Sequence, residues 1–372
     1  MKISFSLRSK VAAAFITGAV AAGSVATASN TQPSGAVKAC SDNRTGALFV
    51  SSTGSCSSGR TLIEIGGNGM NTKAISSLVT PSVVSIAVST SSGSGSGSGS
   101  VYKSNSSSSF IITNNHVIES AASSGTIRVE LTNGDQFTAR IVGRDPGYDL
   151  AVLQVQRGNL PEIALGDSSK VSVGDPVLAL GSPLGLASTV TSGIISALNR
   201  PVSTGSGDAQ SYVNAIQTDA AINPGNSGGA LVDAQGRIIG VNSAIATLSS
   251  GGVGGSIGLG FAIPINEAKR VIDEIISTGK STRPVLGVFF DNTYTGVGAK
   301  IGRLSTGEGA EKAGIPVGSV IKSIDGTKIS DQLAAIVKIR SYAPGTKVTV
   351  VVELPTGGTK TYNVTLGSAP SN

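Results

Sequence analysis

Apolar residues along this chain fall mainly into short runs that alternate with polar residues, which is the pattern of half-buried β-strands. The alternation is clear through residues 82–88 and 126–131, and Asn133-Gly134 then marks a tight hairpin turn. Further short apolar runs follow at 150–155, 176–181, 188–196, 230–232 and 237–244. So many closely spaced strands predict a β-sandwich or a pair of β-barrels.

The glycine-serine run at residues 91–100 has the composition of a flexible linker. However, the strand pattern of 82–88 ends just before this run, and an apolar strand resumes at Phe110 just after it. We therefore expect an elongated hairpin loop between two strands here, and not a tether between two domains.

One segment, residues 266–278, has apolar residues at helical spacing, and Gly279 follows it as a stop signal. A boundary follows at 281–284, after which a second block contains four apolar runs and a helical pattern near 331–339. The predicted organisation is a leader at 1–28, a small element at 29–69, a domain at 70–280 and a second domain at 281–368.

Residues 1–28 have the features of a secretory signal peptide. Three bases precede an apolar stretch, and Ala26-Thr27-Ala28 matches a small-residue cleavage pattern, so the exported chain would begin near Ser29. An uncleaved membrane anchor is the alternative, because the apolar stretch is about as long as the shortest spanning helix. We expect a periplasmic, envelope-bound or secreted protein.

The composition, 39% hydrophobic and 13% charged, describes a globular protein. The formal charge of +6 becomes small once the bases of the leader are removed. No Lys/Arg cluster is interleaved with aromatic residues, so nucleic acid is not an expected partner. Cys40 and Cys56 are the only cysteines, and in an exported chain they predict one disulfide. No metal or cofactor site is indicated.

His116 is the only histidine of the chain. A histidine that moves protons near neutral pH needs a nucleophile and a carboxylate beside it. Ser227 is the candidate nucleophile, because the glycines of its GNSGG stretch permit a strained turn and let backbone N–H groups approach a carbonyl oxygen. The α/β-hydrolase order places His after Ser, and the subtilisin order needs an acid before His, where only Asp42 and Glu64 occur. The remaining order is His, Asp, Ser.

The acid is then expected between His116 and Ser227. Asp149 directly precedes the apolar run 150–155, so a strand can anchor it against the imidazole. Asp145 lies beside a proline in a turn and is expected to be solvated. We therefore assign Asp149 as the acid.

Five motifs, ITNNHVI, DPGYDLAVLQV, GSPLG, TDAAINPGNSGGALVD and GLGFAIP, together resemble the HtrA (high-temperature requirement, or Deg) serine proteases over residues 72–370. The resemblance implies a mainly β chain: a chymotrypsin-like double β-barrel followed by a PDZ domain of the α+β class. It implies that Ser227 is the nucleophile, His116 the general base and then acid, and Asp149 the residue that orients His116. Backbone N–H groups of Gly225 and Ser227 would form the oxyanion hole.

The resemblance also implies where a substrate binds. The strand that contains Asn242, Ser243 and Ala244 would pair with the substrate backbone. Ile222, Ile245 and residues near Ile257 would line a pocket for small or medium apolar side chains, although plain core packing explains these isoleucines equally well.

In the PDZ domain, the backbone N–H groups of Leu286, Gly287 and Val288 would receive the carboxylate of a C-terminal peptide. The expected partners are unfolded polypeptides at the catalytic site, C-terminal peptides at the PDZ groove, and further copies of the chain in trimers or larger assemblies.

The sequence therefore predicts an exported serine endopeptidase that degrades unfolded or damaged proteins, with peptide recognition and regulation by the PDZ domain. A catalytically silent chaperone or peptide sensor is a second hypothesis, which the filled catalytic positions disfavour. An envelope adhesion protein built around the Cys40/Cys56 element is a third, and only that element speaks for it.

Overall fold

The computed structural model describes residues 37–45, 47–51, 53, 55–65, 70–182, 189–204, 211–243 and 258–371. Contacts divide the chain into two compact units, Met1–Gly69 and Met70–Asn372. The predicted signal peptide at 1–28 lies outside the described residues. Among the residues that are described, no helix has the length and apolar character needed to cross a bilayer.

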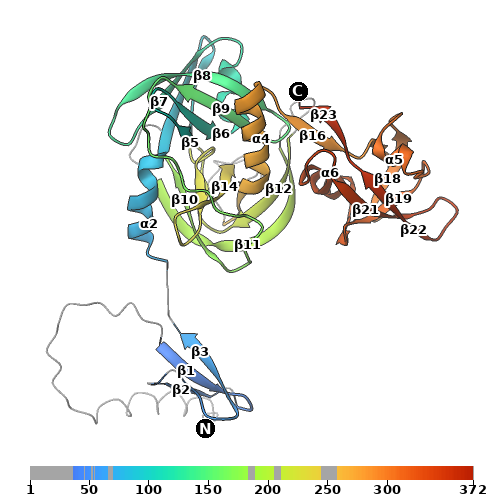
Figure 1. Cartoon of the computed structure of the whole chain (residues 1–372), viewed down its shortest axis with the longest axis horizontal. Coiled ribbons are helices and arrows are strands. Elements are labelled where there is room, and N and C mark those ends of the chain that lie inside the picture. Colours follow the sequence, from blue (N-terminus) through green and yellow to red (C-terminus); the bar gives the residue numbers. More distant parts are fainter. Residues whose placement is uncertain are drawn as a thin grey trace, which may run out of the picture. The chain divides into compact units, whose positions relative to one another are not determined.

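The first unit contains a three-stranded antiparallel sheet with the order β2-β1-β3 (Figure 1). The strands are β1 (Val37–Asp42), β2 (Leu48–Val50) and β3 (Arg60–Ile65). Cys40 on the central strand is joined to Cys56, which confirms the predicted disulfide. So small a sheet buries little apolar surface, and a cross-link of this kind stabilises it by restricting the unfolded chain.

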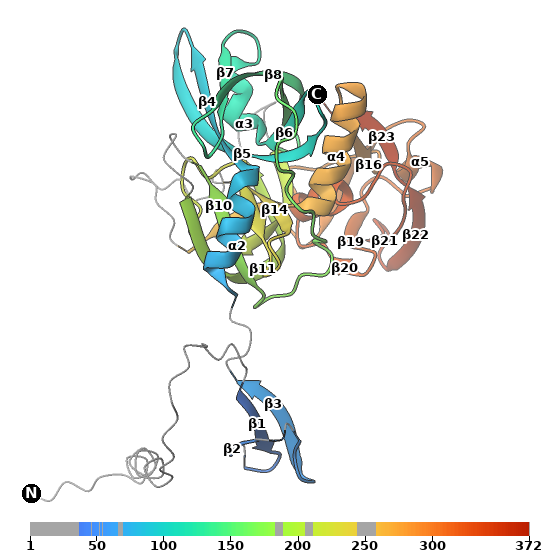
Figure 2. The same ribbon diagram turned by 60° about the vertical axis from the view of Figure 1, so that its left-hand side comes forward.

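The second unit begins with helix α2 (Thr72–Val79), and a six-stranded closed barrel with the order β4-β5-β6-β9-β8-β7 follows it (Figure 2). Its strands are β4 (Val83–Thr90), β5 (Gly93–Ser104), β6 (Ser109–Thr113), β7 (Thr126–Glu130), β8 (Gln136–Asp145) and β9 (Leu150–Val155). The one-turn helix α3 (Asn115–Ile118) follows β6 directly. The alternating apolar positions of the sequence fill this barrel, as the pattern predicts.

The glycine-serine run is a strand, so our expectation of an elongated loop is wrong. Strand β5 pairs with β4 up to Thr90 opposite Gly93, which leaves a two-residue turn. A Cβ on Gly97 would lie 2.6 Å from Val117, and the equivalent atom on Gly99 would also meet side chains of the barrel interior. Gly97 and Gly99 therefore face the core of this barrel, whereas Ser98 and Ser100 are buried on the opposite face of the strand. This pattern has no apolar side chains that would reveal it in the sequence.

A second closed barrel has the order β10-β11-β12-β15-β14-β13. Its strands are β10 (Pro176–Gly181), β11 (Thr189–Thr204), β12 (Ser211–Thr218), β13 (Ala230–Val232), β14 (Ile238–Ser243) and β15 (Gly260–Pro264). One cluster of buried apolar residues includes side chains from both barrels. The two barrels therefore share a packed core where they meet, which holds the neighbouring strand ends in place.

Helix α4 (Ile265–Thr278) confirms the predicted amphipathic helix and contacts strands of both barrels. Its apolar face is buried, and Gly279 ends it in the left-handed conformation with φ 78°.

The C-terminal block contains a sheet with the order β17-β18-β19-β21-β22, in which β20 pairs with β19, and a separate two-stranded sheet of β16 and β23. The strands are β16 (Thr282–Val285), β17 (Val288–Phe290), β18 (Ala299–Leu304), β19 (Val320–Ile324), β20 (Thr327–Lys328), β21 (Lys347–Glu353), β22 (Thr359–Thr365) and β23 (Gly367–Pro370). Two helices, α5 (Gly309–Lys312) and α6 (Gln332–Arg340), complete the block. Asp331 caps α6 by accepting a hydrogen bond from the Ala334 N–H, and α6 contacts β11 and β12 of the second barrel.

Candidate active site

The pairing of two strands brings His116 and Asp149 together at one end of the first barrel. His116 lies on α3, directly after β6, and Asp149 lies directly before β9. Because β6 and β9 are paired, with Thr113 opposite Ala151, two residues 33 positions apart in the sequence become neighbours.

The His116 ring and the Asp149 carboxylate form a close pair. Nδ1 of His116 lies 2.9 Å from Oδ2 and 3.0 Å from Oδ1 of Asp149, and the His116 backbone N–H donates to Oδ1 at 3.0 Å. The Asp149 side chain is 5% exposed and the His116 side chain 21%. A carboxylate that accepts the Nδ1 proton holds the neutral ring in the tautomer whose Nε2 can take a proton.

Asp149 is held in an uncommon backbone conformation. Its φ is 53°, in the left-handed region, which aspartate tolerates at a cost of about 1–3 kcal/mol. The Asn114 side chain donates to the Asp149 carbonyl at 2.9 Å, and the Asp149 N–H donates to the Pro146 carbonyl at 3.2 Å. From the second barrel, the Ser243 hydroxyl lies 3.4 Å from Asp149 Oδ2. The surrounding contacts therefore fix both the backbone and the carboxylate of Asp149.

Asp145 is fully buried, so our expectation that it is solvated is wrong. Its Oδ1 accepts hydrogen bonds from the Ser371 hydroxyl at 2.6 Å and the Tyr148 N–H at 3.0 Å. Its Oδ2 accepts from the Ser281 hydroxyl at 2.6 Å. Ser281 and Ser371 lie far away in the sequence, so the carboxylate links the first barrel to the start and the end of the C-terminal block.

Ser227 lies in a turn between β12 and β13 that only glycines can build, and it is 4% exposed. Gly225 and Gly228 have φ values of 97° and 83°, in the left-handed region. A Cβ on Gly228 would lie 2.2 Å from the Ser98 carbonyl oxygen, and one on Gly229 would lie 2.1 Å from the Leu180 carbonyl oxygen. The spacing of glycines around Ser227 therefore has a steric cause.

Backbone contacts hold this turn against one strand of each barrel, β5 and β14. The Ser98 N–H donates to the Ser227 carbonyl at 2.8 Å, and the Gly228 N–H donates to the Asn242 carbonyl at 2.9 Å. Asn242 directly precedes Ser243, whose hydroxyl meets Asp149. The turn thus contacts the first barrel at Ser98. Through Asn242 at the end of β14 it is also linked to Ser243, whose hydroxyl contacts Asp149.

Two of the predicted substrate-binding residues, Asn242 and Ile222, are fully buried. Asn242 is fully buried, and its side chain donates to the carbonyls of Leu180 and Ala230, both at 3.1 Å. Its backbone N–H and carbonyl are bonded to the nucleophile turn, so a substrate strand would pair from Ser243 onward. Ile222 is fully buried within the core of the second barrel.

Three positions of the predicted substrate site lie outside the described residues. These are Ala244, Ile245 and the neighbourhood of Ile257.

The loop predicted to receive a peptide carboxylate leads into the edge strand β17 of the C-terminal sheet. Leu286 is buried, and Gly287 has a φ of 82° and approaches Glu308 so closely that a Cβ would lie 2.2 Å from the Glu308 Cβ. A groove of about 560 Å³ runs past this loop and Val288, between β17 and α6. Its apolar floor includes Phe290, Ile336 and Ile339.

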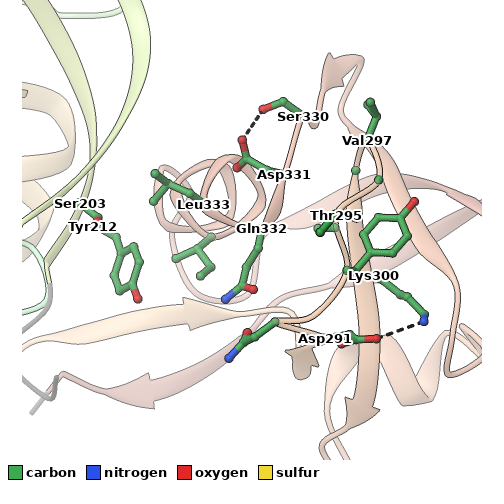
Figure 3. Close-up of a pocket in the computed structure, with 16 residues that line it drawn as sticks. Ser203, Tyr212, Asp291, Thr295, Val297, Lys300, Ser330, Asp331, Gln332 and Leu333 are labelled. Atoms are coloured by element: carbon green, nitrogen blue, oxygen red, sulfur yellow. Dashed lines mark hydrogen bonds and ion pairs between the residues drawn. The ribbon is translucent and has the colours of Figure 1, made fainter. Parts of the chain in front are cut away.

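A polar hollow of about 660 Å³ shares Tyr212 and Gln332 with the groove and extends it along the same helix (Figure 3). The ion pair of Asp291 and Lys300, at 3.1 Å, lies on one side of this hollow. Neighbouring hydroxyl and amide groups, together with Lys300, hold the pKa of Asp291 at about 2. Asp331, the capping residue of α6, lies on the other side.

Sequence reasoning missed two residues that support the site, Asn114 and Ser98, and it gave Ser243 only a role in substrate binding. Asn114 and Ser243 hold Asp149, and Ser98 holds the nucleophile turn. Their only signal is position: Asn114 lies two residues before His116, and Ser98 belongs to a run that composition alone describes as a linker. Within the described ranges, no group of three or more His, Cys, Asp or Glu residues could hold a metal ion.

Comparisons with known proteins agree with this geometry. The family described as the trypsin-like peptidase domain matches residues 97–241. Over 307 residues, the chain is 45% identical to the serine protease PepD of Mycobacterium tuberculosis, an alignment that covers 79% of this chain and 66% of that protein. It is 41% identical over 253 residues to the periplasmic serine endoprotease DegP of Escherichia coli, which covers 65% of this chain and 51% of that protein.

Solved structures show the same relationship. An HtrA-type protease, AlgW with a tripeptide, has a TM-score of 0.61 and 36% identity, and the match covers 81% of this chain and 98% of that one. A serine endoprotease from Yersinia pestis has a TM-score of 0.55 and 32% identity over 81% of this chain and 99% of that one.

The double barrel and these matches define the chain as a trypsin-like serine peptidase. It belongs to the HtrA family of serine proteases. The chain spans about half to two thirds of the length of the curated relatives cited above.

Proposed function

We propose that the chain is an exported serine endopeptidase that degrades unfolded or damaged proteins through Ser227, His116 and Asp149. The observation that carries the proposal is the His116 ring fixed by the buried Asp149 carboxylate, at 2.9 Å and 3.0 Å. A base oriented in this way takes the Ser227 proton as the hydroxyl attacks a peptide carbonyl, and it then returns the proton to the leaving amine. Asp149 stabilises the imidazolium that forms in between.

The backbone N–H groups of Gly225 and Ser227 bind the negative charge that develops on the carbonyl oxygen. The left-handed φ of Gly225 supports this role, because it turns the chain sharply just before the nucleophile. One such donor contributes about 2.7–4 kcal/mol to transition-state stabilisation in a comparable protease.

The substrate backbone adds to the end of β14, from Ser243 into Ala244, and the primary pocket accepts small or medium apolar side chains. Ile222 is fully buried in the core of the second barrel, which fits core packing better than a pocket wall.

The C-terminal block acts as a PDZ domain that binds the C-terminal end of a polypeptide. Three features support this role: the groove, the loop of Leu286, Gly287 and Val288 at one end of it, and the edge position of β17. An edge strand offers unpaired backbone groups, so an extended peptide can add to the sheet there, with its carboxylate on the N–H groups of the loop. Upstream peptide residues then reach the polar hollow near Asp291 and Asp331.

Export through the leader at 1–28 and assembly into trimers or larger oligomers complete the proposal. The name of the Escherichia coli relative, a periplasmic endoprotease, supports export.

The test combines a serine-directed fluorophosphonate with hydrolysis of unfolded casein, for the parent chain and for Ser227→Ala. The parent is expected to be labelled and to cleave casein, and Ser227→Ala to lose both properties, because loss of the nucleophile lowers kcat about a millionfold in a comparable enzyme. His116→Ala is expected to lose nearly as much. A parent that suppresses casein aggregation without cleaving it would support the silent chaperone instead.

A further inference from the structure

Ser98 is a buried residue of the glycine-serine strand, and its contacts concentrate on the nucleophile turn. It is fully buried and makes four hydrogen bonds with other described residues. Its N–H donates to the Ser227 carbonyl at 2.8 Å, and its hydroxyl donates to the Gly225 carbonyl at 2.6 Å. The same hydroxyl accepts from the Ser182 N–H at 2.7 Å, and the Ser98 carbonyl accepts from the Thr113 hydroxyl at 2.7 Å.

The direction of the Ser98 hydroxyl proton follows from these partners. A serine hydroxyl has one proton to donate, and a backbone N–H such as that of Ser182 can only donate. Since the Ser182 N–H takes one acceptor site of the oxygen, the proton is directed to the Gly225 carbonyl. This hydrogen bond is short and shielded from water, which strengthens it.

Gly225 needs such a restraint more than its neighbours do. A glycine rotates freely about its backbone bonds, and the φ of 97° at Gly225 is only one of its accessible conformations. Donors to an oxyanion work only when they are held in place before the charge develops. Ser98 holds the carbonyls of Gly225 and Ser227, the two residues whose N–H groups bind the oxyanion in the proposed mechanism.

We propose that Ser98 is a positioning residue for the oxyanion hole, and that its hydroxyl holds the Gly225 backbone in the conformation that binds the transition state. This inference rests on the proposed function of Ser227 and Gly225. It gives the glycine-serine strand of the first barrel a direct effect on catalysis in the second.

The chain offers a matched control two residues away. Ser100 is fully buried on the same face of β5, and its hydroxyl has no hydrogen-bond partner among the described residues. Ser98→Ala is expected to lower kcat about tenfold to a hundredfold and to change KM less than about threefold, because the loss concerns the transition state. Ser100→Ala is expected to keep the parent kcat and KM.

A tetrahedral inhibitor separates positioning from general weakening of the fold. A peptide boronate that ends in a small apolar residue places an anionic oxygen in the oxyanion hole, so its affinity should fall in Ser98→Ala by the same factor as kcat/KM. An uncleaved peptide should bind equally to Ser227→Ala and to the Ser98→Ala/Ser227→Ala double variant. Urea unfolding of both single variants shows whether a difference in stability contributes.

Ser98→Thr keeps the hydroxyl and is expected to retain a kcat within about threefold of the parent. Three results would overturn the inference: equal kcat in Ser98→Ala and Ser100→Ala, unchanged boronate affinity in Ser98→Ala, or a folded Ser98→Thr as slow as the alanine variant. If Ser98→Ala does not fold, Ser98→Thr is compared with the parent instead, and a folded Ser98→Thr whose kcat is more than about tenfold below the parent value overturns the inference. Substantial activity in Ser227→Ala would instead refute the proposed function itself.

Discussion

The hydroxyl of Tyr148 donates a hydrogen bond of 2.8 Å to the backbone carbonyl of Arg340, which joins the residue directly before Asp149 to helix α6. The Arg340 guanidinium donates in return to the Gly147 carbonyl, and it lies 4.7 Å from the centre of the Tyr212 ring. Arg340 and Tyr212 also line the groove proposed to bind peptides. A groove-lining side chain thus contacts the turn that leads to Asp149, the proposed catalytic acid.

Arg340→Ala is expected to weaken the effect of a bound peptide on hydrolysis at the catalytic site. Coupling between two sites is commonly 1–3 kcal/mol, and loss of this contact should reduce it by about 1 kcal/mol, or roughly fivefold in the rate ratio. The measurement is hydrolysis of a short chromogenic substrate during titration with a C-terminally apolar peptide. Peptide affinity is measured separately by fluorescence anisotropy, because Arg340 also lines the groove.

The control for this prediction is Arg303→Ala, on β18, whose guanidinium lies 3.7 Å from the Phe289 ring. It is expected to keep the parent response to peptide. An unchanged response in Arg340→Ala, with peptide binding confirmed, would mean that the contact carries no coupling.

Asp145→Asn is expected to lower stability more than activity. The carboxylate accepts hydrogen bonds from Ser281 and Ser371, and hydrogen bonds to charged groups contribute about 1.5–3 kcal/mol each. Replacing the charge by an amide should lower the free energy of unfolding by about 1–3 kcal/mol, as measured by urea denaturation. Asp149→Asn, by contrast, should reduce kcat about ten-thousandfold, as loss of the orienting acid does in a comparable protease. The reverse ranking of the two variants in kcat would contradict our assignment of the acid.

Ser371→Ala removes one donor and leaves the Asp145 carboxylate in place. It is expected to cost less than Asp145→Asn, and it tests whether the Asp145 effect arises from this contact.

The sequence is informative where chemistry or a clear apolar pattern limits the choice of residues. A single histidine and a glycine-flanked serine leave few possible partners, so chain order and the neighbouring strand single out Asp149, whose carboxylate does contact the His116 ring. Helix α4 is equally predictable, because its apolar residues recur at helical spacing and a glycine, Gly279, follows its last turn.

The sequence is uninformative where contacts between residues far apart along the chain determine the local structure. In the sequence, Asp145 looks like a turn residue. In the fold, its carboxylate is buried against Ser281 and Ser371, which lie 136 and 226 positions further along the chain. Strand β5 has no apolar side chains in its first half, so the pattern that reveals other strands is missing. Two of its glycines, Gly97 and Gly99, are required by close packing against Val117 and Ile111, which only the folded barrel brings near.

The packing of these glycines predicts a difference between two alanine variants of the same strand. Gly97→Ala would place its Cβ 2.6 Å from Val117, whereas Gly95→Ala would meet nothing within 4 Å. Overpacking a barrel core typically costs 1–3 kcal/mol, so Gly97→Ala is expected to lower the free energy of unfolding by about that amount. Gly95→Ala should change it by less than about 0.5 kcal/mol. Equal effects in chemical denaturation would show that the run is not packed as a barrel strand.

Glu267 predicts a pH dependence of stability. Part of its side chain reaches solvent, but its carboxyl lies deep beside Asn214, and burial raises its pKa from 4.5 to about 8 despite the attraction of Arg270 and Lys338. The folded state therefore binds this proton more tightly than the unfolded state. Below pH 4.5 both states hold the proton, and stability falls as the pH rises from there to about 8.

Glu267→Gln should remove this contribution, since the amide stays neutral at every pH. Between pH 5 and 8, the parent is expected to lose stability relative to the variant, by at most about 1.4 kcal/mol per pH unit for a single proton. Urea unfolding at several pH values measures the difference. Glu353→Gln, which replaces an exposed carboxylate on β21, is the control and should follow the parent. Parallel curves for the parent and Glu267→Gln would show that Glu267 carries the same charge in the folded and unfolded states throughout this range.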